Sequence, residues 1–158
     1  MATLEDICKG GALIRHHPEL ETTELEKRVL CFSTAFKTWL ATDLAPVPCF
    51  SGRRLTPYEQ TEQILYDYVI GRPMAYSIEI RKLEPLSQHV WELKTPDVKL
   101  FGWVPQKAHF IVTNGTLKKN VQRFKDYDPH IQVAASFRAA LNLDEPKSVT
   151  GVLANDIL

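Results

Sequence analysis

The sequence predicts an α+β fold, in which a small antiparallel sheet of about four strands carries N-terminal helices and one C-terminal helix. The first reason is a change near residue 75, where apolar residues stop recurring every three or four positions and begin to alternate. The second is a series of turn signals, such as Thr95-Pro96-Asp97 and Asn114-Gly115, that divide the alternating region into short strands. We therefore expect residues 1–75 to be a helical extension packed on a sheet domain of residues 76–158, as one compact unit.

Helices are expected at 23–41, 57–70 and 129–142. The first follows Thr23, which forms a capping box with Glu26, and its apolar stripe should bury Phe32, Phe36 and Leu40 against the sheet. The second has Thr56 as its cap and Pro57 in its first turn, and the third has Asp128 and Pro129 in the same places.

Strands are expected at 76–81, 89–95, 98–104 and 108–114. The first alternates Tyr76, Ile78 and Ile80 with polar residues, which is typical of a half-buried strand. Large aromatic residues follow in the central strands: Trp91, Phe101 and Trp103. They belong either to the core or to an exposed surface that stacks nucleic-acid bases. We expect Trp91 and Phe101 in the core and leave Trp103 open.

Composition narrows the classes of function. The formal net charge is zero, which argues against indiscriminate coating of nucleic acid. No apolar run approaches the length of a membrane helix, and the first residues, MATLEDICKGG, are acidic where a signal peptide is basic. We expect a cytoplasmic protein with no membrane association. Three widely spaced cysteines favour free thiols, and without CxxC or HxxxH spacing we expect neither a metal nor a cofactor.

Positive charge is concentrated between Val90 and Lys125, where lysine and arginine outnumber the acids. A basic sheet in a neutral protein suggests a surface for an anion, with RNA as the first candidate. The alternative is that strand lysines only keep the sheet soluble and block pairing at its edges. The candidate nucleic-acid-binding residues are Lys94, Lys99, Lys118, Lys119 and Arg123.

A candidate catalytic group lies in the same segment. His109 is placed to act as a general acid or base near neutral pH, and Lys99 and Lys119 could stabilise an anionic phosphorane. A lone histidine on a strand is also commonly structural. No glycine-rich phosphate loop and no GxSxG motif is present.

Several short motifs follow one another in a recognisable order. They are Leu86, Trp91-Glu92-Leu93-Lys94, Lys99, Lys118-Lys119, Ala135 and Arg138. Over about residues 80–141 this order resembles the RelE/ParE superfamily, and within it the HigB-like, phage-derived toxin group. The resemblance implies a small antiparallel sheet with helices on one side. It also implies a metal-independent mRNA endonuclease of a toxin–antitoxin or mobile-element system, although some members poison gyrase instead.

The sequence departs from that pattern at positions that matter. Lysines stand where the family usually has arginines, and the tail, SVTGVLANDIL, holds no counterpart of the family's C-terminal catalytic tyrosine or histidine. The leading hypothesis is a protein that interacts with RNA or the ribosome, with or without ribonuclease activity. The alternatives are a non-catalytic phage or mobile-element protein that binds an antitoxin-like or other protein partner, and a small metabolic enzyme with its site between the N-terminal helices and the sheet.

Overall fold

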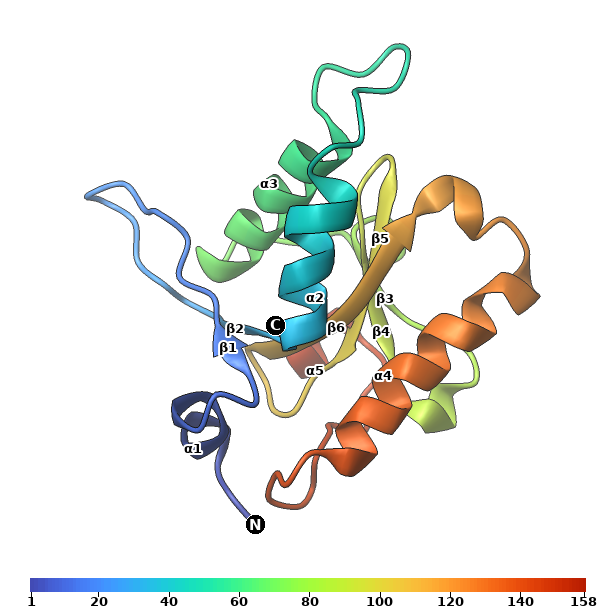
Figure 1. The fold of residues 1–158 in the computed structure, drawn as a ribbon. Helices are drawn as coiled ribbons and strands as arrows, with labels where there is room; N and C mark the ends of the chain where they lie inside the picture. Colours follow the sequence, from blue (N-terminus) through green and yellow to red (C-terminus); the bar gives the residue numbers. More distant parts are fainter.

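The computed structural model describes residues 1–158 and has a single six-stranded mixed sheet with the order β1-β2-β6-β5-β4-β3 (Figure 1). The α+β class is confirmed, but the expectation of a wholly antiparallel sheet of about four strands is wrong. β2 pairs with β6 in parallel, and every other pairing is antiparallel. The strands are β1 Ile14–Arg15, β2 Val29–Phe32, β3 Ile80–Lys82, β4 Trp91–Lys94, β5 Val98–Trp103 and β6 His109–Leu117.

Five α-helices surround this sheet: α1 Leu4–Lys9, α2 Thr34–Trp39, α3 Pro57–Val69, α4 Asp128–Ala140 and α5 Ala154–Ile157. A π-helical turn, Leu40–Leu44, extends α2, and short 3-10 helices lie at Leu86–Gln88, Lys118–Asn120 and Phe124–Tyr127. α3 begins as predicted, with the Thr56 side chain capping Glu59 N and Pro57 in the first turn. α4 agrees with the predicted helix at 129–142, although its N-cap is Tyr127 and no side chain caps it.

The predicted helix at 23–41 is wrong in its first half. Residues Val29–Phe32 form β2, which pairs with His109–Val112 of β6 in the middle of the sheet. Ser33 ends this strand and starts α2, because its Oγ accepts a hydrogen bond from Phe36 N (3.0 Å) and donates one to Thr113 O (2.8 Å). Phe36 is buried as expected, whereas Leu25 is 71% exposed. Residues 1–75 therefore contribute two strands to the sheet as well as helices.

Two further boundaries differ from the prediction. Of the predicted strand 76–81, only Ile80 and Arg81 belong to a strand, β3, which ends at Lys82, and Ile78 is 71% exposed. Asn114-Gly115 does not turn the chain, because β6 continues to Leu117. Gly115 is required there by packing: a Cβ atom would lie 2.8 Å from the Trp39 ring.

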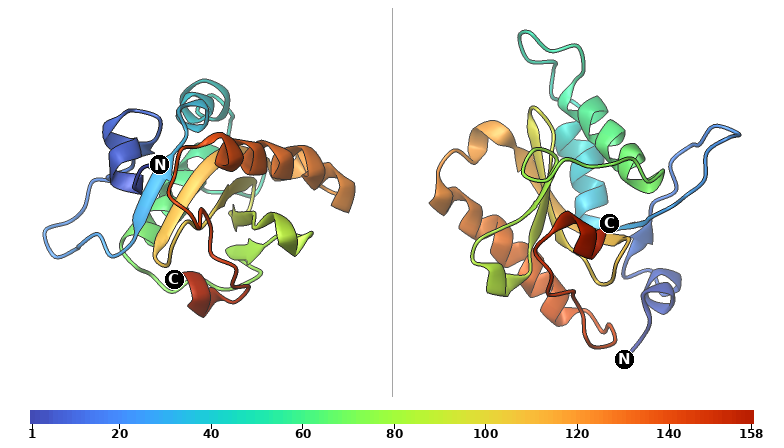
Figure 2. Two further views of the ribbon diagram at one scale, coloured as in Figure 1. Left: turned by 90° about the horizontal axis from the view of Figure 1, so that it is seen from below. Right: turned by 180° about the vertical axis from the view of Figure 1, so that it is seen from behind.

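The two faces of the sheet are covered by different helices (Figure 2). Phe110 and Val112 of β6 belong to a core shared with α2 and α3, whereas Ile111, between them, packs toward the N-terminal segment and the end of α4. α4 also covers Phe101 through Ile131 and Ala134. No helix in this chain combines the length and apolar character needed to cross a membrane.

Candidate functional site

Four charged side chains gather on the α4 face of the sheet. In β4, Leu93 belongs to the core on the α2 and α3 side, so Glu92 and Lys94 point to the opposite face. The strand register places Arg81 of β3 opposite Glu92 and Lys99 of β5 opposite Lys94. Simple alternation along three neighbouring strands therefore brings three cations and one carboxylate together.

Glu92 is the centre of this group and its side chain is fully buried. Its Oε1 accepts a hydrogen bond from Arg81 Nε at 2.5 Å. Lys99 Nζ lies 3.8 Å from Oε2 and Lys94 Nζ lies 4.0 Å from Oε1. Oε2 has no hydrogen-bond partner. A buried carboxylate among three cations offsets the repulsion that two facing lysines would otherwise feel.

Burial and neighbouring charges shift the pKa of two cations of the cluster, Arg81 and Lys94. Burial disfavours the charged form of Arg81, but the attraction and hydrogen bond of Glu92 outweigh it, and the pKa of Arg81 is raised. The pKa of Lys94 is lowered, chiefly by burial. Glu92 opposes that shift, and the neighbouring cations, Lys99 among them, reinforce it. Burial is thus the largest single cause acting on both cations, and Glu92 favours the charged form of each.

Tyr127, in the turn before α4, contacts two cations of the cluster. Its Oη accepts hydrogen bonds from Lys99 Nζ and from Arg81 Nη2, the latter at 3.2 Å. The Lys99 Nζ atom lies 4.6 Å from the centre of the Tyr127 ring, and the Arg81 guanidinium carbon lies 5.6 Å from it. A phenolic hydroxyl thus sits directly between two cations on the solvent side of Glu92.

A cavity of about 770 Å³ opens above these residues. We call it the basic groove. Its cationic lining comes from four separate segments of the chain. The loop before α3 supplies Arg53, whose Nε lies 3.1 Å from Asp97 Oδ2. The lining residues used below are Phe50, Arg53, Arg81, Lys99, Lys118, Lys119, Arg123, Phe124 and Tyr127.

The basic groove contains most of the residues predicted to bind nucleic acid. Lys99, Lys118, Lys119 and Arg123 line it, and Lys94 lies beneath it against Glu92. Sequence reasoning missed Arg81 and Tyr127. Arg81 was detectable, since its alternation with Ile80 places it on the face of the lysines, whereas Tyr127 lies in an irregular turn without a periodic signal.

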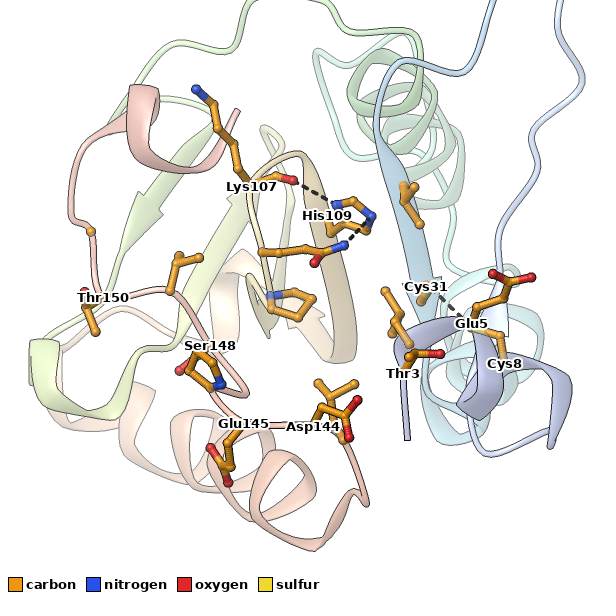
Figure 3. Close-up of a pocket in the computed structure, with 18 of the residues that line it drawn as sticks. Thr3, Glu5, Cys8, Cys31, Lys107, His109, Asp144, Glu145, Ser148 and Thr150 are labelled. Carbon is orange, nitrogen blue, oxygen red and sulfur yellow. Dashed lines mark hydrogen bonds between the residues drawn. The ribbon is translucent and has the colours of Figure 1, made fainter. Parts of the chain in front are cut away.

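His109 lies elsewhere. It begins β6, whereas Lys118 follows the end of that nine-residue strand, so roughly 30 Å of extended chain separates them. His109 instead lines a second cavity of about 1140 Å³, where its ring is hydrogen-bonded to Lys107 O (2.8 Å) and to Gln106 (2.9 Å; Figure 3). The structure does not bring together His109, Lys99 and Lys119, the three residues predicted to be catalytic.

The same second cavity contains two cysteines. Cys8 Sγ of α1 lies 3.6 Å from Cys31 Sγ of β2 (Figure 3), and both thiols are free. Burial raises the pKa of Cys31 far above its usual range, so its thiol stays protonated. No group of three or more His, Cys, Asp or Glu side chains is arranged to hold a metal ion.

The large aromatic residues of the central strands all belong to the interior. Trp91, Phe101 and Trp103 are fully buried, as expected for the first two. Trp103, which was left open, donates its indole N–H to Lys147 O at 2.8 Å. None of the three is accessible for stacking on a base. No protein-family model, curated protein or solved structure matches this sequence.

Proposed function

We propose that this protein binds RNA in the basic groove and cleaves it there without a metal ion. The observation that carries the proposal is that Arg81, Lys99, Lys118, Lys119 and Arg123 line one cavity with Tyr127, whose hydroxyl accepts hydrogen bonds from Arg81 and Lys99. The protein as a whole is neutral, and its one strongly basic stretch supplies most of these cations. A concentration of positive charge from separate segments favours a phosphate backbone as ligand. The motif order shared with the HigB-like toxin group supports the same class of substrate.

Binding and chemistry are assigned to different parts of the groove. Lys118, Lys119 and Arg123 are exposed at the rim and would neutralise phosphates of the bound strand. Lys99 is only 6% exposed and, with Tyr127, lies at the floor. A phosphate that entered the groove would meet the exposed rim cations first and the more buried Lys99–Tyr127 pair last.

The expected reaction is transesterification within the RNA. The 2′-hydroxyl of one nucleotide attacks the adjacent phosphorus, the bond from phosphorus to the 5′-oxygen breaks, and a 2′,3′-cyclic phosphate and a 5′-hydroxyl result. Tyr127 and Lys99 would relay the proton from the 2′-hydroxyl to the leaving oxygen, and Lys119 would stabilise the phosphorane. Tyr127 supplies the aromatic hydroxyl that the C-terminal tail lacks.

Glu92 has a supporting role in this scheme. Because its side chain is fully buried beneath Arg81 and Lys99, it does not reach the substrate. It holds the two cations in place and compensates their charge while the groove is empty. His109 takes no part in the scheme, because it lies at the opposite end of β6.

Binding of RNA at two salt concentrations, with and without ribosomes, tests the first half of the proposal. Affinity should fall steeply with salt, because each neutralised phosphate releases counterions. Replacing Lys118 and Lys119 by alanine should weaken binding and flatten the slope of log affinity against log salt by about one unit per lost contact. His109→Ala is the matched control and should change neither quantity. Absence of salt-dependent binding in both settings would reject the RNA proposal and favour a protein partner.

Cleavage of the bound RNA tests the second half. Tyr127→Phe keeps the ring but removes the hydroxyl, so we expect cleavage to fall by about 100-fold or more while binding is retained. Products should end in a 2′,3′-cyclic phosphate and form equally well with a chelator present. Binding without any cleavage by the unaltered protein would contradict the catalytic assignment and leave a non-catalytic RNA-binding protein.

A further inference from the structure

Two phenylalanine rings stand at the rim of the basic groove beside its cations. Phe124 opens the 3-10 helix Phe124–Tyr127 and is 70% exposed. Phe50, in the loop before α3, lies with its ring centre 5.6 Å from Lys119 Nζ. Phe124 belongs to none of the three hydrophobic clusters of the core. Phe50 and Phe124 line the same cavity as Lys118, Lys119 and Arg123. Aromatic faces beside cations are the combination that binds single-stranded nucleic acid.

The backbone around Phe124 is fixed by hydrogen bonds within its own turn. The Asp126 carboxylate accepts hydrogen bonds from Arg123 N at 2.9 Å and from Gln122 N at 3.2 Å. Gln122 Nε2 in turn donates to Lys119 O at 3.0 Å. These bonds fix Phe124 in the segment that carries Lys119 and Arg123, and the same segment ends at Tyr127 on the groove floor.

We propose that Phe124 and Phe50 are base-stacking residues of the basic groove, so that its ligand is an unpaired RNA segment and not a duplex. This inference rests on the proposed RNA-binding function. Cations alone recognise phosphates in both forms of RNA, but an aromatic face gains energy only from a base whose own face is free. A duplex hides its base faces in the stack and would meet Phe124 with its backbone. With a nucleobase on Phe124, the adjoining phosphate lies over the lysines of the same segment.

Only aromatic residues at the rim of the groove can stack on a base, because those of the sheet are not accessible. The aromatic residues of β4 and β5 face inward and are fully buried. Tyr127 already covers Lys99 and Arg81 with its ring. The other two aromatic side chains that line the groove are Phe124, which is 70% exposed, and Phe50, which has Lys119 Nζ over one face of its ring.

Three probes of equal backbone charge per strand separate stacking from charge. They are a short single-stranded oligoribonucleotide of mixed sequence, the same strand with abasic sites throughout, and its duplex with the complement. Affinity is measured by fluorescence anisotropy at one salt concentration. The unaltered protein should bind the single strand more tightly than either other probe. Phe124→Ala should weaken single-strand binding roughly 5- to 100-fold, the range for one lost base stack, and leave binding of the abasic strand unchanged.

Two further variants make the result decisive. Phe124→Leu keeps an apolar side chain without a π face and should behave like Phe124→Ala. Leu153→Ala removes an apolar side chain, 63% exposed, away from the groove and should change nothing. A thermal melt confirms that each variant is folded. Equal weakening of all three probes by Phe124→Ala, or no weakening of any, overturns the stacking inference.

The failure of this inference is distinguishable from failure of the proposed function. If Lys119→Ala weakens every probe but Phe124→Ala weakens none, the groove binds RNA by charge alone and only the stacking assignment is wrong. If the unaltered protein binds none of the probes, either with or without ribosomes, both proposals are wrong.

Discussion

At the scale of single residues, the most consequential side chain is Glu92. It is the buried acid that compensates Arg81, Lys94 and Lys99. We expect Glu92→Gln to lower the free energy of unfolding by about 3 kcal/mol, because Lys99 would be left nearly buried without a counter-charge. Chemical denaturation measures this loss. Glu5→Gln breaks only an exposed pair with Lys9 and should leave the denaturation midpoint unchanged. Equal midpoints for all three proteins would contradict the role given to Glu92.

Histidines link stability to pH at the same scale. Burial is the main cause that lowers the pKa of His16, His89 and His130 below the usual 6.5. The unfolded chain therefore binds more protons than the folded one once the pH falls below about 6.5. We expect the melting temperature to be constant above that pH and to fall progressively below it.

His130 offers a matched variant for this pH effect. Its ring stacks on Phe101 with centroids 4.8 Å apart and planes 4° from parallel. His130→Phe preserves the stacking and removes the proton site, so the melting temperature should fall less steeply between about pH 6.5 and pH 5 than in the unaltered protein. A slope as steep as that of the unaltered protein would show that His130 is not a source of acid sensitivity.

At the scale of secondary-structure elements, the join between β5 and β6 depends on Gly102. The register shifts between Phe101 and Gly102, and a Cβ atom on Gly102 would lie 1.8 Å from Ile111 O of β6. Gly102→Ala must therefore push two central strands apart, and we expect a loss of about 3 kcal/mol or failure to fold. Gly52→Ala is the control: Gly52 has a φ of 80° but nothing within 4 Å, so it should cost about 1 kcal/mol. Similar melting temperatures for both variants would contradict this account.

The elements also show where periodicity misleads. Leu25, Val29, Phe32 and Phe36 recur at helical spacing, but a strand and a helix share that stretch and meet at Ser33. Val29–Phe32 is a continuous apolar run of four residues, which is also typical of a strand buried on both faces. The local pattern could not decide between a helix and a strand, because the strand forms only through its pairing with the distant β6. The hydrogen bond from Ser33 to Thr113, for example, joins residues that are 80 positions apart in the sequence.

At the scale of the whole molecule, the successful predictions were those based on signals between residues close together in the sequence. α3, α4 and the strands β4 and β5 were predicted from local signals, which are the Thr56 cap of α3, the proline in the first turn of α4, and the turns and alternation around the strands. The parallel pairing of β2 with β6 was not predictable in this way, because no local signal records which distant strand a strand will join. The site divides along the same line. The lysines of the groove were predictable because they lie in one basic segment of the sequence. The position of Tyr127 over Lys99 was not, because it depends on the path of the chain into α4.

The position of β2 yields the last prediction, which concerns the whole sheet. Deleting residues 1–55 removes β1, β2 and α2, and with them part of the cover of Phe110 and Val112. Residues His109–Val112 of β6 would then lose their strand partner and become an exposed edge. We expect the truncated chain to lack a cooperative thermal transition and to aggregate, because such an edge pairs with other chains. Adding the separate 1–55 segment during refolding should restore part of the transition, since parallel pairing with β6 needs no covalent connection. A cooperative melt of the truncated chain near the native temperature would instead show that residues 56–158 fold without β2.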